Sequence, residues 1–230
     1  MFGNAIELAQ VIEHTNLKPT ATPADIKALC DEARHYSFYA VVVNPCYVPM
    51  AVELLKDYDV KVCTVIDFPL GASTTASKVM EAVEAVRSGA DELDVVMNIG
   101  LFKAQDYEAS ARQLKDFILL TPGVAHKVII EACYLTDAEK AGASRLVAEV
   151  GADFVKTSTG FGPGGATAHD VRIMKDAAIG KASVKASGGI KTLDTLLDMV
   201  DAGATRIGTS SGVAIVEEFI LRNNKLAGEE

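Results

Sequence analysis

The 230-residue sequence predicts an α/β fold, a single (β/α)8 TIM barrel. Eight short runs of β-branched and apolar residues alternate with longer polar-amphipathic segments along the whole chain. Runs this apolar are typical of parallel strands covered by helices, and eight such units close most naturally into a barrel. No Pro- or Ser-rich linker and no shift in composition divides the sequence, so we expect one domain over residues 1–230.

The expected elements alternate in a regular order. The strands lie near Val11–Leu17, Ala40–Asn44, Lys61–Phe68, Glu92–Asn98, Lys127–Ala132, Asp153–Ser158, Ser183–Ser187 and Arg206–Thr209. Helical patterns cover Pro23–Arg34, Thr74–Ser88, Tyr107–Leu119, Asp137–Val150, His169–Ile179 and Leu193–Asp201. Thr22 and Thr136 look like helix caps, because a hydroxyl there can accept from the first turn. Three helices end in a Gly-Ala pair, and Gly89, Gly151 and Gly203 suit the left-handed position after a helix.

An open, doubly wound sheet is the alternative arrangement of these elements. Such a fold carries a G-x-G-x-x-G loop after its first strand. Here the first expected strand is followed instead by Lys18-Pro19-Thr20-Ala21-Thr22. The barrel is therefore the favoured architecture.

Charge and composition exclude several classes of function. The chain has 31 acidic and 22 basic residues and a formal net charge of −9, whereas nucleic-acid-binding proteins usually carry a basic patch. The longest apolar strings fall far short of the roughly 18 residues of a membrane helix. The N-terminus has no basic segment before an apolar stretch, as a signal peptide would. We therefore expect a soluble, acidic, globular protein with no nucleic-acid or membrane partner.

The cysteines and histidines argue against a metal site or a disulfide framework. No C-x-x-C pair and no zinc-like spacing occurs among Cys30, Cys46, Cys63 and Cys133. No H-E-x-x-H motif occurs, and a structural or solvated role is expected for His14, His35, His126 and His169. The sequence also lacks G-x-S-x-G and a Walker A loop. We expect no metal and no cofactor.

Three charged residues interrupt strands that should otherwise be apolar: Asp94, Lys156 and Lys185. All three are expected late in their strands, and barrel enzymes draw catalytic residues from the carboxyl ends of several strands. The lysines lie on consecutive strands, which are about 4.8 Å apart in a sheet, so their ammonium groups would repel. Repulsion and burial both lower the pKa of an amine, and a Schiff-base nucleophile must be neutral. The alternative is a buried Lys–Asp ion pair with the second lysine reaching solvent.

Segments rich in glycine and hydroxyl residues follow expected strands six, seven and eight, at residues 157–167, 187–190 and 208–212. Barrels frequently bind phosphate in the loops after their last strands, through backbone N–H groups that glycine leaves accessible. One such loop alone is more often a tight turn. Successive loops at this end of a barrel indicate a phosphate site.

Four motifs resemble the deoxyribose-phosphate aldolase family: His14–Pro19, Leu93–Asn98, Phe154–Phe161 and Val184–Ile190. The resemblance runs from about Ile12 to Val216. It implies a class I, metal-free aldolase, a carbon–carbon lyase on a barrel fold. Such an enzyme interconverts 2-deoxy-D-ribose 5-phosphate with acetaldehyde and D-glyceraldehyde 3-phosphate in the cytoplasm, in carbohydrate catabolism that serves deoxynucleoside breakdown. A homodimer is expected from the family.

The resemblance also implies roles for individual residues. Lys156 corresponds to the lysine that forms the Schiff base, Lys185 to the second lysine that lowers its pKa, and Asp94 to the acid/base of the proton relay. The phosphate-binding positions correspond to Gly188, Gly189, Ser210 and Ser211. Further substrate contacts are expected at Thr15, Thr159 and Gly160.

The sequence departs from the family pattern at three places. Glu13 replaces the usual Asp ahead of the His-Thr pair, and Val42 replaces a Cys that some relatives carry. The last residues, Asn224–Glu230, contain no tyrosine, so no role is expected for the tail tyrosine of some members. None of these departures affects Asp94, Lys156 or Lys185.

Three other functions remain open at this stage. A different Schiff-base aldolase, of the transaldolase or keto-acid type, would release a ketone fragment or a keto acid. A sugar-phosphate isomerase or synthase would use the same phosphate loops with Lys156 as a charge only. A phosphate sensor would bind ligand without turnover, but it would gain little from holding two amines together.

Overall fold

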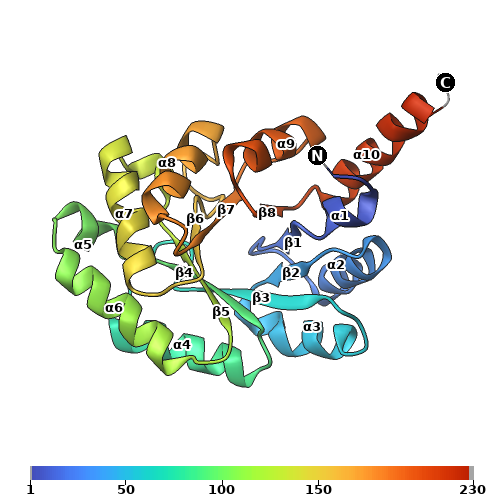
Figure 1. Ribbon diagram of the computed structural model, residues 1–230. Helices are drawn as coiled ribbons and strands as arrows, with labels where there is room; N and C mark the ends of the chain where they lie inside the picture. Colours follow the sequence, from blue (N-terminus) through green and yellow to red (C-terminus); the bar gives the residue numbers. More distant parts are fainter. Residues whose placement is uncertain (1, 228–230) are drawn as a thin grey trace.

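Eight parallel strands close into one barrel in the computed structural model, which describes residues 2–227. Each strand pairs with the next, and β8 pairs back with β1 (Figure 1). The strands are β1 (Ile12–Asn16), β2 (Ala40–Val43), β3 (Lys61–Ile66), β4 (Glu92–Val96), β5 (Ala125–Ile129), β6 (Phe154–Lys156), β7 (Ser183–Ser187) and β8 (Arg206–Thr209). The predicted (β/α)8 barrel is confirmed.

Helices surround the strands as an outer ring, and the end of α10 extends away from the barrel (Figure 1). The helices are α1 (Ala5–Ala9), α2 (Pro23–Tyr36), α3 (Val48–Leu55), α4 (Thr75–Arg87), α5 (Ile99–Lys103), α6 (Tyr107–Leu120), α7 (Asp137–Glu149), α8 (Ala168–Ala178), α9 (Leu193–Ala202) and α10 (Gly212–Ala227), with 3-10 turns η1 (Pro45–Tyr47) and η2 (Ala132–Tyr134). Within residues 2–227, none of these helices combines the length and apolar character needed to cross a bilayer.

The six helices expected from the sequence are present, and four others were missed. Both α1 and α5 have five residues, too few to show a helical period. The short α3 follows β2 almost directly through η1. The long α10 begins at Gly212, inside a segment interpreted only as a phosphate loop. Residues 228–230 of the tyrosine-free tail lie outside the described part of the chain.

The helix ends confirm the predicted signals. The side chains of Thr22 and Thr136 each accept a hydrogen bond from the third residue of their helix and complete capping boxes. Gly89, Gly151 and Gly203 have φ angles of 98°, 89° and 111°, in the left-handed region where a side chain is unfavourable. The caps mark where helices begin after the loops at the carboxyl ends of the strands, and the glycines mark where helices end before the next strand.

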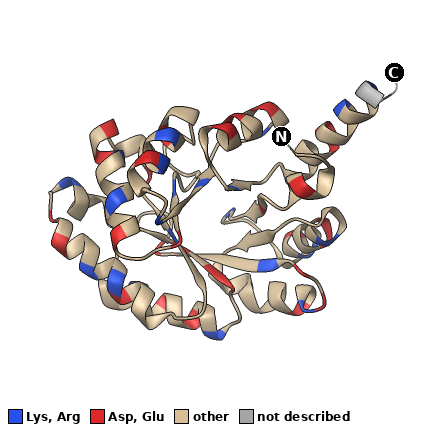
Figure 2. Ribbon diagram, viewed as in Figure 1, with Lys and Arg blue, Asp and Glu red and all other residues tan. Residues whose placement is uncertain are grey.

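The two faces of the strands differ in character. Outward residues such as Val41, Val43 and Val62 belong to the main apolar core beneath the helices. Inward residues form a small apolar cluster on one side, with Val42, Cys63 and Val65 at its centre. Charged positions also occur on strands inside the ring of helices (Figure 2). The barrel interior is therefore partly apolar and partly ionic.

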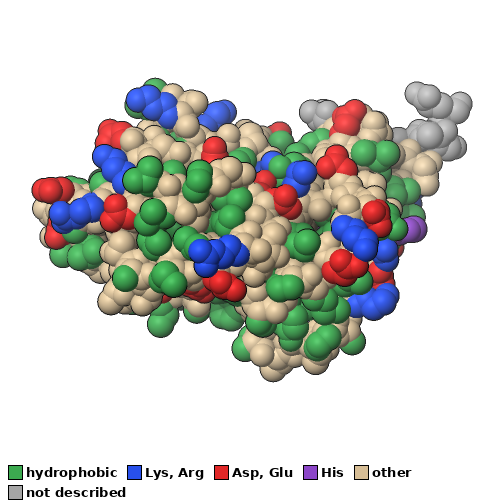
Figure 3. Space-filling model, turned by 90° about the horizontal axis from the view of Figure 1, so that it is seen from below, with side chains coloured by type: hydrophobic (Ala, Val, Ile, Leu, Met, Phe, Trp, Pro, Cys, Tyr) green, Lys and Arg blue, Asp and Glu red, His purple; other side chains and the backbone are tan. Residues whose placement is uncertain are grey.

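The outer surface mixes charges of both signs. On the face seen in Figure 3, acidic and basic side chains stand among apolar ones over the outer helices. A mixed arrangement of this kind produces only a weak local field. The strongest grouping of charge in the molecule lies instead inside the barrel.

Candidate active site

The three charged residues singled out in the sequence meet inside the barrel. Oδ2 of Asp94 lies 2.6 Å from Nζ of Lys156 and 2.6 Å from Nζ of Lys185. Lys156 and Lys185 are register partners on β6 and β7, so the predicted adjacency of the two lysines is confirmed. Lys156 is the last residue of β6, whereas Asp94 and Lys185 lie at the middle of their strands rather than late in them. The expected late position is therefore confirmed for Lys156 and wrong for Asp94 and Lys185.

Lys127 is a third lysine of this cluster, and the sequence analysis missed it. Its Nζ lies 2.8 Å from Oδ1 of Asp94 and 2.6 Å from Oε2 of Glu92. The strand was expected to begin at Lys127, where a lysine is unremarkable, but β5 begins at Ala125 and places Lys127 in its middle. The period of two along a strand also puts Glu92 on the same inward face as Asp94. This period of two was the sequence signal from which the inward position of Glu92 could have been predicted.

Glu13 and Arg206 complete the ionic cluster. Glu13 contacts Lys185, and its Oε2 lies 3.5 Å from Nζ of Lys127. Arg206 stacks on Tyr39, with its guanidinium 3.1 Å from the ring centroid, and lies 3.6 Å from carboxylate oxygens of Glu13 and Glu92. The glutamate that replaces the usual aspartate at position 13 thus contacts Lys185 directly, so the expectation that this departure leaves the three central residues unaffected is wrong.

The count of charges in this cluster is informative. Three carboxylates face four basic groups: Glu13, Glu92 and Asp94 against Lys127, Lys156, Lys185 and Arg206. Buried charges are stable only when they are paired. If Lys156 is a neutral amine, three anions match three cations. The geometry therefore accommodates one uncharged lysine.

The pKa shifts distinguish Lys156 from the other two lysines of the cluster. Burial lowers the pKa of Lys156, and the neighbouring Lys185 ammonium lowers it further, although Asp94 opposes both. Burial also acts to lower the pKa of Lys185, but Asp94 and Glu13 outweigh it and raise that pKa. Burial acts to raise the pKa of Asp94, yet the three lysines hold it well below its usual range. Of the three lysines of the cluster, Lys127 and Lys185 thus have a raised pKa and Lys156 a lowered one, which is the direction that a nucleophilic amine requires.

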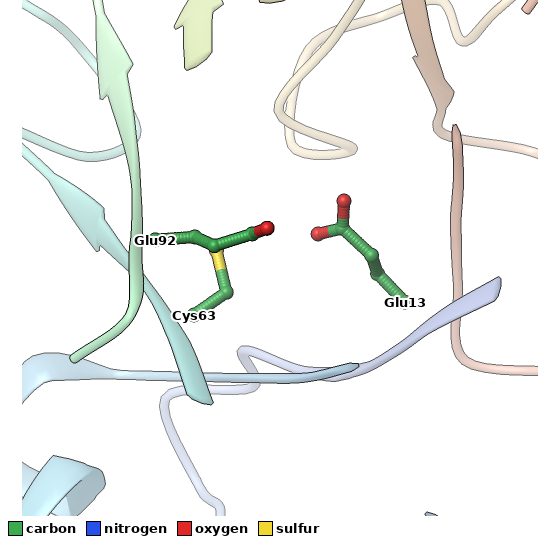
Figure 4. A group of neighbouring side chains, drawn as sticks. All are labelled: Glu13, Cys63 and Glu92. Atoms are coloured by element: carbon green, nitrogen blue, oxygen red, sulfur yellow. The ribbon is translucent and has the colours of Figure 1, made fainter. Parts of the chain in front are cut away.

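A group that resembles a metal site lies in the same cluster. Glu13, Cys63 and Glu92 point toward one another (Figure 4). Nζ of Lys127 lies 3.3 Å from the Cys63 sulfur and 2.6 Å from Glu92, so an ammonium group occupies the space that a metal ion would take. Burial raises the pKa of the Cys63 thiol far above its usual value, and a protonated thiol is a poor ligand. The donor set suits an ammonium, not a metal.

A cavity of about 470 Å³ opens at the carboxyl ends of the strands, above this cluster. Lys156 lines it although only 3% of the residue is exposed, so its amine faces the cavity from the floor. Asp94 and Lys185, each 0% exposed, lie beneath the floor and do not line the cavity. The other predicted binding residues that line it are Thr15, Thr159, Gly160, Gly188, Gly189 and Ser210, whereas Ser211 does not.

One wall of the cavity is built from backbone. Gly188 and Gly189 have φ angles of 84° and 80°, which a residue with a side chain adopts rarely. A Cβ on Gly165 would lie 2.2 Å from the carbonyl oxygen of Gly188, so the two loops touch through their backbones. Ser210 and Ser211 lead into α10, a helix of 16 residues whose first N–H groups have no partner within the helix. This wall has the features of an anion site.

The two threonines of the predicted site have local partners. The Thr15 hydroxyl donates to the carbonyl oxygen of Glu13 at 3.0 Å. The Thr159 hydroxyl bonds to the carboxylate of Glu131, a second buried acid that the sequence analysis missed. Glu131 was placed inside the expected strand Lys127–Ala132, where a charged residue among apolar ones was the available signal, but β5 ends at Ile129 and Glu131 directly precedes η2.

Comparison with known proteins agrees with this arrangement. The profile of the DeoC/LacD family aldolase matches residues 8–218. The chain belongs to this aldolase family. It is 54% identical over 221 residues to the deoxyribose-phosphate aldolase of Carboxydothermus hydrogenoformans, an alignment that covers 94% of this chain and 97% of the relative. The family resemblance expected from the four motifs is confirmed.

Solved structures of aldolases share the fold. The tetrameric deoxyribose phosphate aldolase of Aeropyrum pernix superposes with a TM-score of 0.89 at 37% identity, covering 95% of this chain and 93% of that one. The aldolase QR15 superposes with a TM-score of 0.92 at 45% identity, covering 98% of this chain and 100% of that one. Membership of an aldolase family favours carbon–carbon chemistry over the isomerase and sensor alternatives.

Proposed function

We propose that this aldolase reversibly cleaves 2-deoxy-D-ribose 5-phosphate to D-glyceraldehyde 3-phosphate and acetaldehyde through a Schiff base on Lys156. The observation that carries the proposal is the position of Lys156. It is the lysine of the ionic cluster that reaches the cavity, and burial beside a second ammonium lowers its pKa. The names of the relatives supply the substrate class.

The cleavage follows from a neutral amine at this position. The Lys156 amine attacks the C1 aldehyde of the open-chain sugar phosphate, and loss of water leaves a protonated imine. The imine accepts the electron pair of the C2–C3 bond as the 3-hydroxyl loses its proton and the phosphorylated aldehyde departs. Protonation of the remaining enamine and hydrolysis release acetaldehyde and the free amine. Asp94, which bridges Lys156 and Lys185 at 2.6 Å each, is suited to pass these protons.

The remaining predicted residues bind the rest of the substrate. Backbone N–H groups of Gly188 and Gly189, with Ser210 and Ser211 at the start of α10, hold the phosphate by oriented dipoles. Thr15, Thr159 and Gly160 form the wall beside the sugar carbons. We place the reaction in cytoplasmic deoxyribose phosphate breakdown and infer a homodimer. Light scattering distinguishes that dimer from a tetramer like the relative in Aeropyrum pernix.

Trapping of the imine tests the proposal. The protein is incubated with acetaldehyde, reduced with sodium borohydride and digested for peptide mass spectrometry. We expect a single ethyl group, on the peptide that contains Lys156. An adduct with pyruvate or dihydroxyacetone in place of acetaldehyde would favour the keto-acid or transaldolase alternative. Absence of any adduct on folded protein would contradict the Schiff-base mechanism.

The pH dependence of turnover tests the role of Lys185. The Lys185 ammonium lowers the pKa of Lys156, so its removal in Lys185→Met raises that pKa. The nucleophilic form of Lys156 is the neutral amine, which accumulates above its pKa. We therefore expect the acid limb of the kcat/KM profile to move to higher pH in Lys185→Met, and to stay in place in Lys185→Arg, which keeps the charge. An unmoved limb in both variants would contradict the repulsion argument.

A further inference from the structure

Glu131 is a buried acid with an unusual backbone. Its φ is 47° and its ψ is 67°, in the left-handed region that residues other than glycine, asparagine and aspartate seldom occupy. Only 2% of the residue is exposed. Such conformations persist when surrounding contacts hold them, and they cluster at functional sites. The contacts of the Glu131 side chain should therefore reveal what the conformation is for.

Those contacts lead to one residue. Oε1 of Glu131 accepts the backbone N–H of Thr159 at 3.1 Å, and Oε2 accepts the Thr159 hydroxyl. Among residues 2–227, no lysine, arginine or histidine nitrogen lies within ion-pair distance of this carboxylate. The loop also closes over it, because a Cβ on Gly162 would lie 3.2 Å from Cδ of Glu131. Both carboxylate oxygens therefore bond to Thr159, and the only other side-chain donor near them in residues 2–227 is the weak one of the Cys133 thiol, 3.9 Å from Oε1.

The two bonds fix the direction of the Thr159 hydroxyl. Its single proton is donated to Glu131, and one of its two lone pairs accepts the N–H of Phe161 at 3.0 Å. One lone pair remains, on a residue that lines the cavity together with Gly160, Phe161 and Lys156. With its proton committed, the hydroxyl can serve a ligand only as a hydrogen-bond acceptor. The group it suits is a ligand hydroxyl.

We propose that Glu131 is a positioning residue for substrate specificity: it orients Thr159 to accept a hydrogen bond from the hydroxyl beside the aldehyde of the phosphorylated acceptor. The inference rests on the proposed function, because it concerns the acceptor of that reaction. Glu131 does not line the cavity and acts through Thr159 alone. A site built to accept from a hydroxyl discriminates against an analogue without one, because its own polar group is then left unpaired.

The test compares two acceptors in the synthesis direction, with acetaldehyde as the common donor. One is D-glyceraldehyde 3-phosphate, and the other is 3-oxopropyl phosphate, the same chain without the hydroxyl. We expect the native enzyme to have a higher kcat/KM with D-glyceraldehyde 3-phosphate. In Glu131→Gln, the ratio of kcat/KM for the two acceptors should fall about tenfold. The side-chain oxygen of glutamine can accept from either the backbone N–H or the hydroxyl of Thr159, but its NH2 group cannot accept from the other, so two donors would face each other. Thr159→Val should lose the same preference.

Two further variants separate positioning from stability. The double variant Glu131→Gln/Thr159→Val should lose no more preference than either single one, because both changes break one contact. Asp153→Asn removes another carboxylate that accepts a backbone N–H, that of His126 at 2.8 Å, at the opposite end of the barrel. It should leave the ratio of the two acceptors unchanged.

Several outcomes would overturn the proposal. In the first, Glu131→Gln loses kcat/KM equally for both acceptors. In the second, Thr159→Val keeps the preference for D-glyceraldehyde 3-phosphate over 3-oxopropyl phosphate. In the third, the native enzyme shows no such preference. The Thr159→Val result decides the matter if Glu131→Gln does not fold. Failure of the proposed function is a separate result, because the native enzyme would then turn over neither acceptor and form no imine with acetaldehyde.

Discussion

A Lys156→Met variant should lose turnover of 2-deoxy-D-ribose 5-phosphate by roughly 10⁴-fold or more while its free energy of unfolding does not fall. Methionine has nearly the length of lysine but no amine, so no imine can form. The stability expectation follows from the charges in the barrel. If Lys156 is neutral, its removal leaves three carboxylates paired with Lys127, Lys185 and Arg206. A well-packed apolar side chain then costs nothing in lost ion pairing.

Steady-state kinetics and urea unfolding measure the two effects. Lys61→Met is a suitable control, because Lys61 opens β3 at the far end of the barrel and its ion-pair partner in the described part of the chain is the exposed Asp59, at 3.6 Å. Its effect on stability should stay within about 0.5 kcal/mol. Activity of Lys156→Met within tenfold of the parent would place the nucleophile elsewhere. A stability loss of several kcal/mol would mean that Lys156 is a charged member of the buried ion pair.

Local patterns in the sequence were sufficient for the fold and for part of the site. Periodicity and helix caps depend on neighbouring residues, so the eight strands and the glycine-terminated helices could be predicted one element at a time. The adjacency of Lys156 and Lys185 also followed, because consecutive strands of a barrel are neighbours. Asp94 stood out because an aspartate within an apolar strand requires a partner.

The residues that were missed depend on features that a local pattern does not contain. Lys127 was misjudged because the start of its strand was placed two residues late, which moved it from the middle of the strand to its edge. Glu13 reaches Lys185 across the β8–β1 closure, a contact between residues 172 apart in the chain. Glu131 was placed inside the expected strand Lys127–Ala132, whereas β5 ends at Ile129 and Glu131 has a positive φ angle that the strand pattern does not contain. Such contacts become visible only when the barrel is closed.

Asp94→Asn should have the largest combined effect on activity and stability. The carboxylate of Asp94 bonds to the three lysines of the ionic cluster, at 2.6 Å from Lys156 and Lys185 and 2.8 Å from Lys127. Asparagine keeps the shape but removes a carboxylate charge that pairs with the ammonium groups of Lys127 and Lys185. We expect a loss of about 3–5 kcal/mol in the free energy of unfolding. In addition, loss of the proton relay should lower kcat/KM by about 10²–10⁴-fold, the range typical of acid–base catalysis.

A second change separates the two roles of Asp94. The double variant Asp94→Asn/Lys127→Met removes one charge of each sign, so part of the lost stability should return, whereas the relay between Lys156 and Lys185 remains absent and kcat/KM should stay low. Asp91→Asn is the matched control, because that carboxylate accepts the Val62 N–H at 2.8 Å just before β4 begins. If activity recovered together with stability in the double variant, Asp94 would act only by holding the lysines together. If neither recovered, the charges of the cluster would not be coupled through Asp94, and the assignment of Lys156 as its neutral member would lose its basis.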